Sequence, residues 1–104
     1  MMDLNEKLYE EHLAGEKPLL VDYWAPWCGY CRRIAPAMKR IAEKYDFLTV
    51  GQVDMDQDEA LWDEEQIEVI PTLVLYQGGK ALGSIVVPES RGQIERFLQE
   101  TLNG

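Results

Sequence analysis

The stretch Trp24-Ala25-Pro26-Trp27-Cys28-Gly29-Tyr30-Cys31-Arg32 places two cysteines directly after an apolar run, Leu19-Leu20-Val21-Asp22-Tyr23-Trp24. That run is short and shows no alternation, which is typical of a β-strand covered on both faces. From Cys28 onward, apolar residues recur at the spacing of one helix face: Ile34, Met38, Ile41, Ala42 and Tyr45. The two cysteines therefore lie where a buried strand passes into a helix.

The spacing of the cysteines limits their chemistry. Two cysteines three positions apart cannot form the several bridges of a small secreted domain, so they are either a redox pair or half of a metal site. At a helix N-terminus, unpaired N–H groups and the helix dipole lower the pKa of a thiol such as Cys28 from about 8.5. Cys31, one turn further in, is expected to keep a higher pKa and is suited to attack a mixed disulfide on Cys28.

Asp22 is the one carboxylate within the apolar run. An ionised carboxylate in such a strand costs several kcal/mol, so we expect a raised pKa and partial protonation. A carboxylate that is satisfied by a local hydrogen bond is the alternative.

The rest of the chain continues the alternation of helices and strands. Helices are predicted over residues 5–14 and 58–67 and after a capping box at Ser90-Arg91-Gly92-Gln93, and strands over 47–53, 72–76 and 81–87, the last two joined by Gln77-Gly78-Gly79-Lys80. This order predicts an α/β protein with a mixed sheet and helices on both faces. With 104 residues and no linker-like segment, we expect one domain over residues 1–104.

The whole pattern resembles the thioredoxin family. The resemblance rests on the segment at residues 24–32 and on four further matches: Asp22, Pro36, Ile70-Pro71-Thr72 and Gly78-Gly79. It covers essentially the entire chain and implies the thioredoxin fold, a mixed central sheet of four to five strands flanked by about four helices. Little length remains, however, for the first strand that is usual in the family.

The resemblance also implies a function and a site. The family exchanges thiols and disulfides, so the implied activity is that of a protein-disulfide reductase acting through a mixed disulfide. It implies Cys28 as nucleophile, Cys31 as resolving thiol and Asp22 as proton-transfer group. The implied substrate-binding residues are Trp27, Gly29, Tyr30, Ile70 and Pro71, with Pro71 in the cis form. No bound cofactor is implied, because the cysteines carry the electrons; the implied partners are a thioredoxin reductase as donor and oxidised client proteins.

The sequence departs from the family pattern at three places. Tyr30 stands where typical thioredoxins have proline, Gln52 replaces a lysine that usually pairs with the buried aspartate, and Val87-Pro88 replaces a glycine-containing loop of the substrate groove. The first two leave the redox poise open and the third leaves partner choice open. Two alternatives therefore stand beside the reductase: a disulfide oxidase or isomerase, and a non-catalytic binding or chaperone module.

The composition argues against nucleic-acid-binding and membrane-bound proteins. The formal charge of −9, from 19 acidic and 10 basic residues, repels nucleic acid and anionic lipid. No export signal is recognisable at the start, and no apolar run approaches the roughly 20 residues of a membrane span. We therefore expect a cytoplasmic protein that acts as a monomer.

Two patterns in the sequence suggest a metal site, but neither has the residues that such a site requires. Residues 54–65 imitate an EF-hand loop, but Glu59 occupies the position that requires glycine, and the segment follows a strand. A structural zinc site needs about four nitrogen or sulfur ligands, whereas the chain has two cysteines and His12, which we expect at the surface. We therefore predict no metal site.

Overall fold

A five-stranded mixed sheet forms the centre of the computed structural model, which describes residues 2–4, 10–11, 15–57 and 60–103. The strands are β1 (Met2–Asp3), β2 (Leu19–Trp24), β3 (Thr49–Asp54), β4 (Thr72–Gln77) and β5 (Lys80–Val86), in the spatial order β1-β3-β2-β4-β5. β3 runs parallel to β1 and β2, whereas β4 runs antiparallel to β2 and β5. The sheet thus has the mixed character that the sequence predicts.

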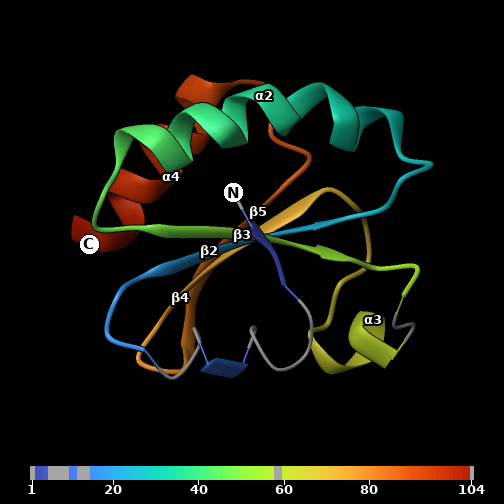
Figure 1. The fold of residues 1–104 in the computed structure, drawn as a ribbon, viewed down its shortest axis with the longest axis horizontal. Coiled ribbons are helices and arrows are strands. Elements are labelled where there is room, and N and C mark those ends of the chain that lie inside the picture. Colours follow the sequence, from blue (N-terminus) through green and yellow to red (C-terminus); the bar gives the residue numbers. More distant parts are fainter. Residues whose placement is uncertain (1, 5–9, 12–14, 58–59, 104) are drawn as a thin grey trace.

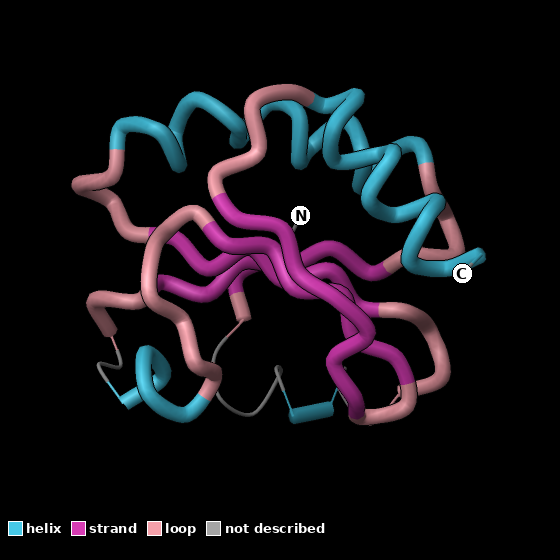
Figure 2. The backbone as a smooth tube through the Cα atoms, turned by 180° about the vertical axis from the view of Figure 1, so that it is seen from behind, coloured by secondary structure: helices cyan, strands magenta, loops and turns pink. Residues whose placement is uncertain are grey.

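Helices cover both faces of this sheet (Figure 1). α2 (Gly29–Lys44) and α4 (Arg91–Asn103) lie side by side on one face, and the short α3 (Ala60–Glu64) lies on the other. The view from behind shows the same three layers (Figure 2). The fold class is therefore confirmed. The described residues contain three helices with defined bounds, whereas the sequence suggested about four. None of the described helices is long and apolar enough to cross a bilayer.

The structure contains the first strand of the sheet, although the sequence leaves little length for it. Two residues suffice, because β1 pairs with β3 and the Leu4 N–H donates to the Gln52 carbonyl at 2.8 Å. Leu4 is buried over Gly51, where an added Cβ would stand only 2.6 Å from Leu4 Cδ1. The absent side chain of Gly51 therefore makes room for the residue that anchors β1.

Several element boundaries differ from the prediction. Of the helix predicted over 5–14, only residues 10 and 11 are described, and both are helical; the rest, including His12, lies outside the described residues. The helix predicted over 58–67 is confined to α3, and residues 58–59 again lie outside the described part. Ile67 follows α3 as a buried residue of the core.

Two apolar clusters hold the layers together. The cluster beneath α2 and α4 contains Leu20, Ile34, Met38, Ile41, Leu48, Val50, Leu73, Leu75, Ile94 and Leu98. The cluster on the opposite face contains Leu4, Leu19, Val21, Tyr23, Val53, Met55, Ile67, Val74 and Tyr76. Alternate residues of β2 enter opposite clusters, which is why the strand reads as continuously apolar. The stripe of α2 is buried as its spacing predicts.

α4 begins with the cap that the sequence predicts, in altered form. Ser90 Oγ accepts the Gln93 N–H at 3.2 Å, as in a capping box. The return bond differs, because Gln93 Oε1 accepts the N–H of Glu89 at 2.6 Å instead of that of Ser90. The motif therefore fixes the helix start and also the residue before it.

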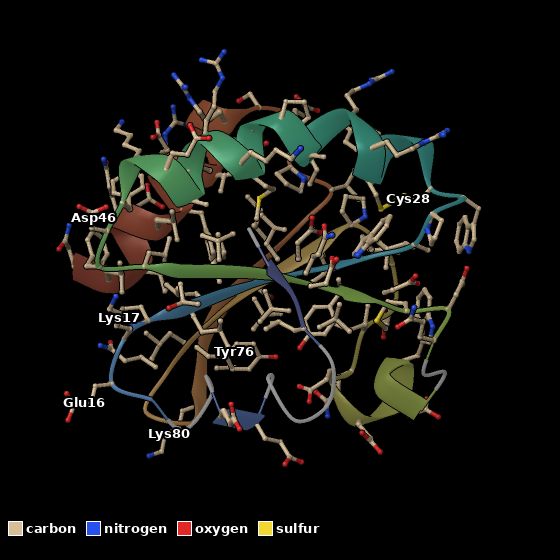
Figure 3. All side chains as sticks on the ribbon, in the orientation of Figure 1. Glu16, Lys17, Cys28, Asp46, Tyr76 and Lys80 are labelled. Atoms are coloured by element: carbon tan, nitrogen blue, oxygen red, sulfur yellow. A yellow bond between two sulfur atoms is a disulfide. The ribbon has the colours of Figure 1, made fainter. Side chains whose placement is uncertain are left out.

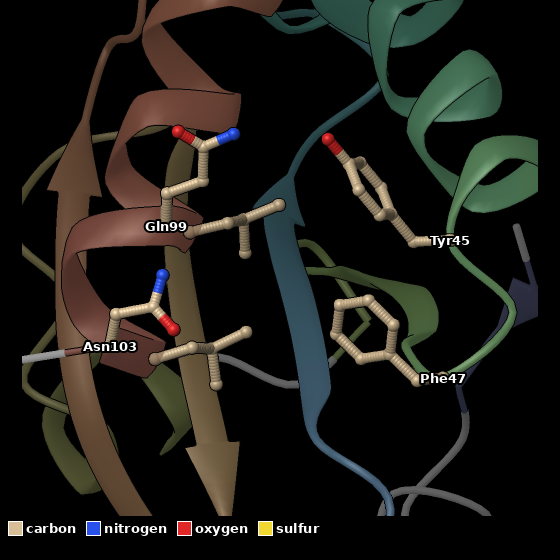
Figure 4. A pocket seen from close by; sticks show the side chains of 6 residues that line it. Tyr45, Phe47, Gln99 and Asn103 are labelled. Carbon is tan, nitrogen blue, oxygen red and sulfur yellow. The ribbon is translucent and has the colours of Figure 1, made fainter.

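The far end of α2 is tied to α4 by polar contacts. Glu95 Oε1 accepts from Lys44 Nζ at 2.9 Å and from the Tyr45 hydroxyl at 3.0 Å. Beside these contacts is a shallow hollow lined by Tyr45, Phe47, Leu98, Gln99, Leu102 and Asn103 (Figure 4). It contains none of the predicted site residues.

The hairpin between β4 and β5 yields a stability prediction. Gly78 and Gly79 have φ of +62° and +80°, a conformation that costs an L side chain about 1–2 kcal/mol. We expect Gly79→Ala to lower the free energy of unfolding by about that amount in urea titration. Gly92→Ala is the matched control: it lies inside α4 with space for a methyl group and should raise stability by about 0.5–1 kcal/mol. Equal effects of the two substitutions would contradict the assignment.

Candidate active site

The two cysteines form a disulfide at the start of α2. Their Cα atoms are 5.2 Å apart. Figure 3 shows Cys28 and Asp46 near opposite ends of α2. Cys28 is 7% exposed and Cys31 only 2%. The sequence left a redox pair and half of a metal site open, and a disulfide between the two sulfurs is the bond that a redox pair forms. In the described part of the chain, no cluster of three or more metal-ligating side chains occurs.

Cys28 is the N-cap of α2. Its Sγ accepts the backbone N–H of Cys31 at 3.1 Å, and its carbonyl accepts the N–H of Arg32 at 3.2 Å. A thiolate at this position would receive an N–H hydrogen bond and the positive end of the helix dipole, with no acidic residue in the first turn to oppose it. The geometry therefore favours an anion on Cys28 over one on the more deeply buried Cys31.

A loop before β4 forms the other wall of the site. The Ile70–Pro71 peptide bond is cis, the isomer that the resemblance implies. The Ile70 carbonyl oxygen lies 3.9 Å from Cys28 Sγ, and the Ile70 side chain packs against the cysteines. The Pro71 carbonyl accepts the N–H of Val87 at 2.8 Å, so β5 and its following loop hold this wall in place.

Trp27 and Tyr30 are the aromatic residues around the disulfide. Trp27 is 64% exposed, but its Nε1 donates to Asp56 Oδ1 at 2.9 Å, which fixes the ring against the turn after β3. Tyr30 packs against the cysteine cluster, and the Arg33 guanidinium lies 5.3 Å from the centre of its ring. The sequence analysis missed Asp56, because the spacing between residues 27 and 56 gives no sign of this contact. Gly29 is the first residue of α2, with open space where a side chain would stand.

Asp22 lies in the middle of β2 and is 2% exposed. Burial raises the pKa of its carboxyl from the ordinary 3.8 to about 7. Its Oδ1 has no hydrogen-bond partner among the groups that the structure describes. The raised pKa follows the expectation, and Oδ1 lacks the local hydrogen bond that the alternative required.

Gln52 is the neutral residue beside Asp22 and supplies no positive charge to offset the burial of the carboxylate. It stands opposite Asp22 in the register of β2 and β3, and opposite Asp3 in the register of β1 and β3. Its Nε2 donates to Asp3 Oδ1, so the side-chain amide is directed to the outer strand. The neutral Gln52 therefore leaves desolvation as the cause of the raised Asp22 pKa.

Val87 carries backbone strain beside the cis-proline loop. Its φ is +44°, which a β-branched residue rarely adopts, and its side chain is exposed. The hydrogen bond from its N–H to Pro71 holds it there, while the neighbouring Pro88 is buried. The departure at Val87-Pro88 thus places an apolar side chain at a backbone position that favours glycine.

The raised pKa of Asp22 makes stability depend on pH. Its folded pKa lies above its unfolded pKa, so its stabilising contribution is complete below about pH 3.8 and is lost as the pH rises to about 7. We expect Asp22→Asn to raise the free energy of unfolding of the oxidised protein by about 2 kcal/mol at pH 5 and about 4 kcal/mol at pH 8. Urea titration measures both values. The exposed carboxyl of Asp46 provides the control Asp46→Asn, and a gain independent of pH would contradict the prediction.

Comparisons with known proteins agree with this geometry. The family model described as Thioredoxin matches residues 1–100. A thioredoxin of Alicyclobacillus acidocaldarius is 34% identical over 102 residues, covering 97% of each chain. A bifunctional thioredoxin reductase/thioredoxin of Mycobacterium leprae is 37% identical over 95 residues, which cover 90% of this chain and 21% of that protein.

Solved structures show the same fold. A mutant thioredoxin from Halobacterium salinarum superposes with a TM-score of 0.86 at 22% identity, covering 97% of this chain and 88% of that one. A disulfide at a strand-to-helix junction, a cis-proline loop against it and a family match over nearly the full length lead to one conclusion. This chain belongs to the thioredoxin family.

Proposed function

We propose that this thiol–disulfide oxidoreductase is a cytoplasmic protein-disulfide reductase that acts as a monomer and a single domain over residues 1–104. The single observation that carries the proposal is the Cys28–Cys31 disulfide at the N-terminus of α2, where Cys28 is the N-cap and is 7% exposed and Cys31 lies one turn further in and is 2% exposed. This asymmetry supports separate roles for the two sulfurs. It is what a reaction through a mixed disulfide requires.

The first step is attack by Cys28. In the reduced protein, the Cys28 thiolate attacks one sulfur of a client disulfide, and the other client sulfur leaves as a thiolate. The exposed ring of Trp27 and the groups around Ile70 and Pro71 flank Cys28 and would receive the client segment. A side chain at Gly29 would meet open space, and Tyr30 packs against the cysteines.

The second step is resolution by Cys31. Its thiolate attacks Cys28 Sγ, releases the second client thiolate and closes the Cys28–Cys31 disulfide. Cys31 must lose its proton for this step, and it is buried. Asp22 supplies the acceptor, since a carboxyl with a pKa of about 7 gains and loses a proton near neutral pH. Two electrons pass from the dithiol to the client, so no bound cofactor takes part.

The oxidised protein must then be reduced. We propose a flavoprotein thioredoxin reductase as the electron donor, with oxidised proteins as clients. The name of the Mycobacterium leprae relative, which joins a thioredoxin reductase and a thioredoxin in one chain, supports this pairing. No nucleic acid or membrane partner is proposed, in keeping with the charge of −9.

Trapping the mixed disulfide tests the two roles. Cys31→Ser should accumulate a covalent adduct with oxidised client proteins through Cys28, visible by mass spectrometry and reversed by dithiothreitol. Cys28→Ser should form much less adduct, because Cys31 is the more deeply buried of the two, at 2% exposed against 7% for Cys28. In the insulin-reduction assay, both variants should lose nearly all activity. Adducts through Cys31 in preference to Cys28 would reverse the assignment, and an active Cys28→Ser variant would refute it.

The reduction potential separates the reductase from the alternative that Tyr30 favours. Equilibration against glutathione should give a value near the roughly −270 mV of thioredoxin. A value between about −180 and −120 mV would instead assign the protein to disulfide oxidation or isomerisation. Tyr30→Pro is the matched variant, because it restores the residue of typical thioredoxins and should move the potential only if Tyr30 sets it.

A further inference from the structure

The outer face of α2 carries four exposed basic side chains, which we call the basic stripe: Arg32, Arg33, Lys39 and Arg40. Residues seven apart in a helix lie on the same side, two turns from each other, so Arg32 is aligned with Lys39 and Arg33 with Arg40. Among the described residues, none of the four side chains forms an ion pair or a hydrogen bond. The stripe is therefore a row of positive charges that the described part of the fold does not neutralise.

The positions of these charges oppose the stability of the helix. Arg32 lies in the first turn of α2, where the positive end of the helix dipole disfavours a cation, and that turn contains no acidic residue. Arg40 and Lys44 are four residues apart, a spacing at which like charges destabilise a helix. The chain has 19 acidic residues, yet Glu43 is the only one in α2. Stability of α2 therefore does not account for the stripe.

Lys44 shows how the fold treats a basic residue that it uses. Its Nζ lies 2.9 Å from Glu95 Oε1, which ties α2 to α4, and this is the one ion pair within the part of the chain that the structure describes. The packing of the two helices thus takes up the charge of Lys44. The charges of the stripe point outward and are left for a partner.

The stripe begins beside the active site. The Arg32 N–H donates to the Cys28 carbonyl at 3.2 Å, and the Arg33 guanidinium lies 5.3 Å from the centre of the Tyr30 ring, which packs against the cysteines. At a rise of 1.5 Å per residue, Arg40 is about 18 Å from Cys28 along the helix axis. An extended segment covers that distance with about five or six residues. A protein that reacts at Cys28 can therefore contact the whole stripe.

We propose that the basic stripe is a docking surface for client proteins that carry acidic residues close to their reactive disulfide. This inference rests on the proposed function, because it assigns a class of client to the reaction at Cys28. Charge decides the occupant: four unpaired cations attract carboxylates, whereas the net charge of −9 repels them elsewhere on the molecule. Such local complementarity speeds encounter and orients the partner. The stripe thus directs an acidic client toward the sulfur with which it reacts.

Arg40→Glu is the variant that separates docking from cysteine chemistry. Arg40 is about 18 Å from Cys28 along α2, well beyond the screening length of about 8 Å at physiological salt. The variant should fold, because it places a carboxylate four residues before Lys44, the favourable orientation for a helix ion pair. Lys80→Glu is the matched control. It makes the same change of net charge at an exposed residue that Figure 3 shows on the opposite side of the molecule from Cys28.

Three synthetic peptides supply the probes. Each contains one cysteine in a mixed disulfide with thiopyridone, together with four glutamates, four glutamines or four lysines within about six residues of that cysteine. The release of thiopyridone gives a second-order rate constant. At low ionic strength, the reduced wild-type protein should react with the glutamate peptide about fivefold faster than with the glutamine peptide. Arg40→Glu should lower this ratio about twofold or more, Lys80→Glu should leave it unchanged, and about 1 M salt should abolish it.

The net charge predicts the opposite order of rates if the stripe does not bind clients. A chain of charge −9 should then react fastest with the lysine peptide. That order, or equal effects of Arg40→Glu and Lys80→Glu, would overturn the docking proposal and leave the reductase function intact. Failure of the wild-type protein to react with any of the three peptides would instead refute the proposed function.

Two other occupants of the stripe have separate signatures. Fluorescence anisotropy would assign the stripe to nucleic acid if a single-stranded oligonucleotide bound more tightly than the glutamate peptide and lost affinity in Arg40→Glu. Sedimentation would assign it to a second copy of this chain if a salt-sensitive dimer dissociated in Arg40→Glu. Either result would overturn the proposal. We expect neither, because the charge of −9 repels both a phosphate backbone and another copy.

Discussion

The packing of α2 on β2 is the constraint on which the site depends. Alternate residues of β2 point into opposite cores, and a short connection of residues 25–28 leads from the strand to α2. Both cysteines are therefore held where the two elements meet. This packing places Cys28 at the N-terminus of the helix and Cys31 deeper inside. It also covers Asp22, whose burial raises its pKa. One packing arrangement thus produces a sulfur at the helix N-terminus, a second sulfur one turn further in and a buried carboxyl with a pKa near neutrality.

The remaining parts of the site come from segments that are distant in sequence. The loop at Ile70 and Pro71 lies against Cys28, and the turn after β3 supplies Asp56 to the ring of Trp27. Val87 supports that loop from the end of β5. These contacts place Cys28 Sγ near an exposed apolar ring and a backbone carbonyl, which is the surface on which the proposed client binding depends. α3 on the far face and the hollow beside Tyr45 contain none of these residues.

The sequence predicted the features that depend on local pattern. β2 was predicted with its observed bounds, and the buried stripe of α2, the Gly-Gly turn and the start of α4 were visible in residue spacing. The misses are contacts between distant segments. β1 depends on the fit of Leu4 over Gly51, Trp27 is fixed by Asp56, and Gln52 turns to Asp3. Each of these needs two strands or turns to be placed first, and no periodicity within a single element encodes them.

Val87 has a consequence for how this chain would evolve. A valine in the left-handed region costs folding free energy on the order of 1–3 kcal/mol, and every valine codon becomes a glycine codon by a single base change. Under selection for thermal stability alone, glycine at this position should therefore arise early and repeatedly. Under selection for binding of particular clients, the exposed side chain beside the cis-proline loop would be retained in spite of its cost. The outcome at this one codon would show which of the two pressures dominates.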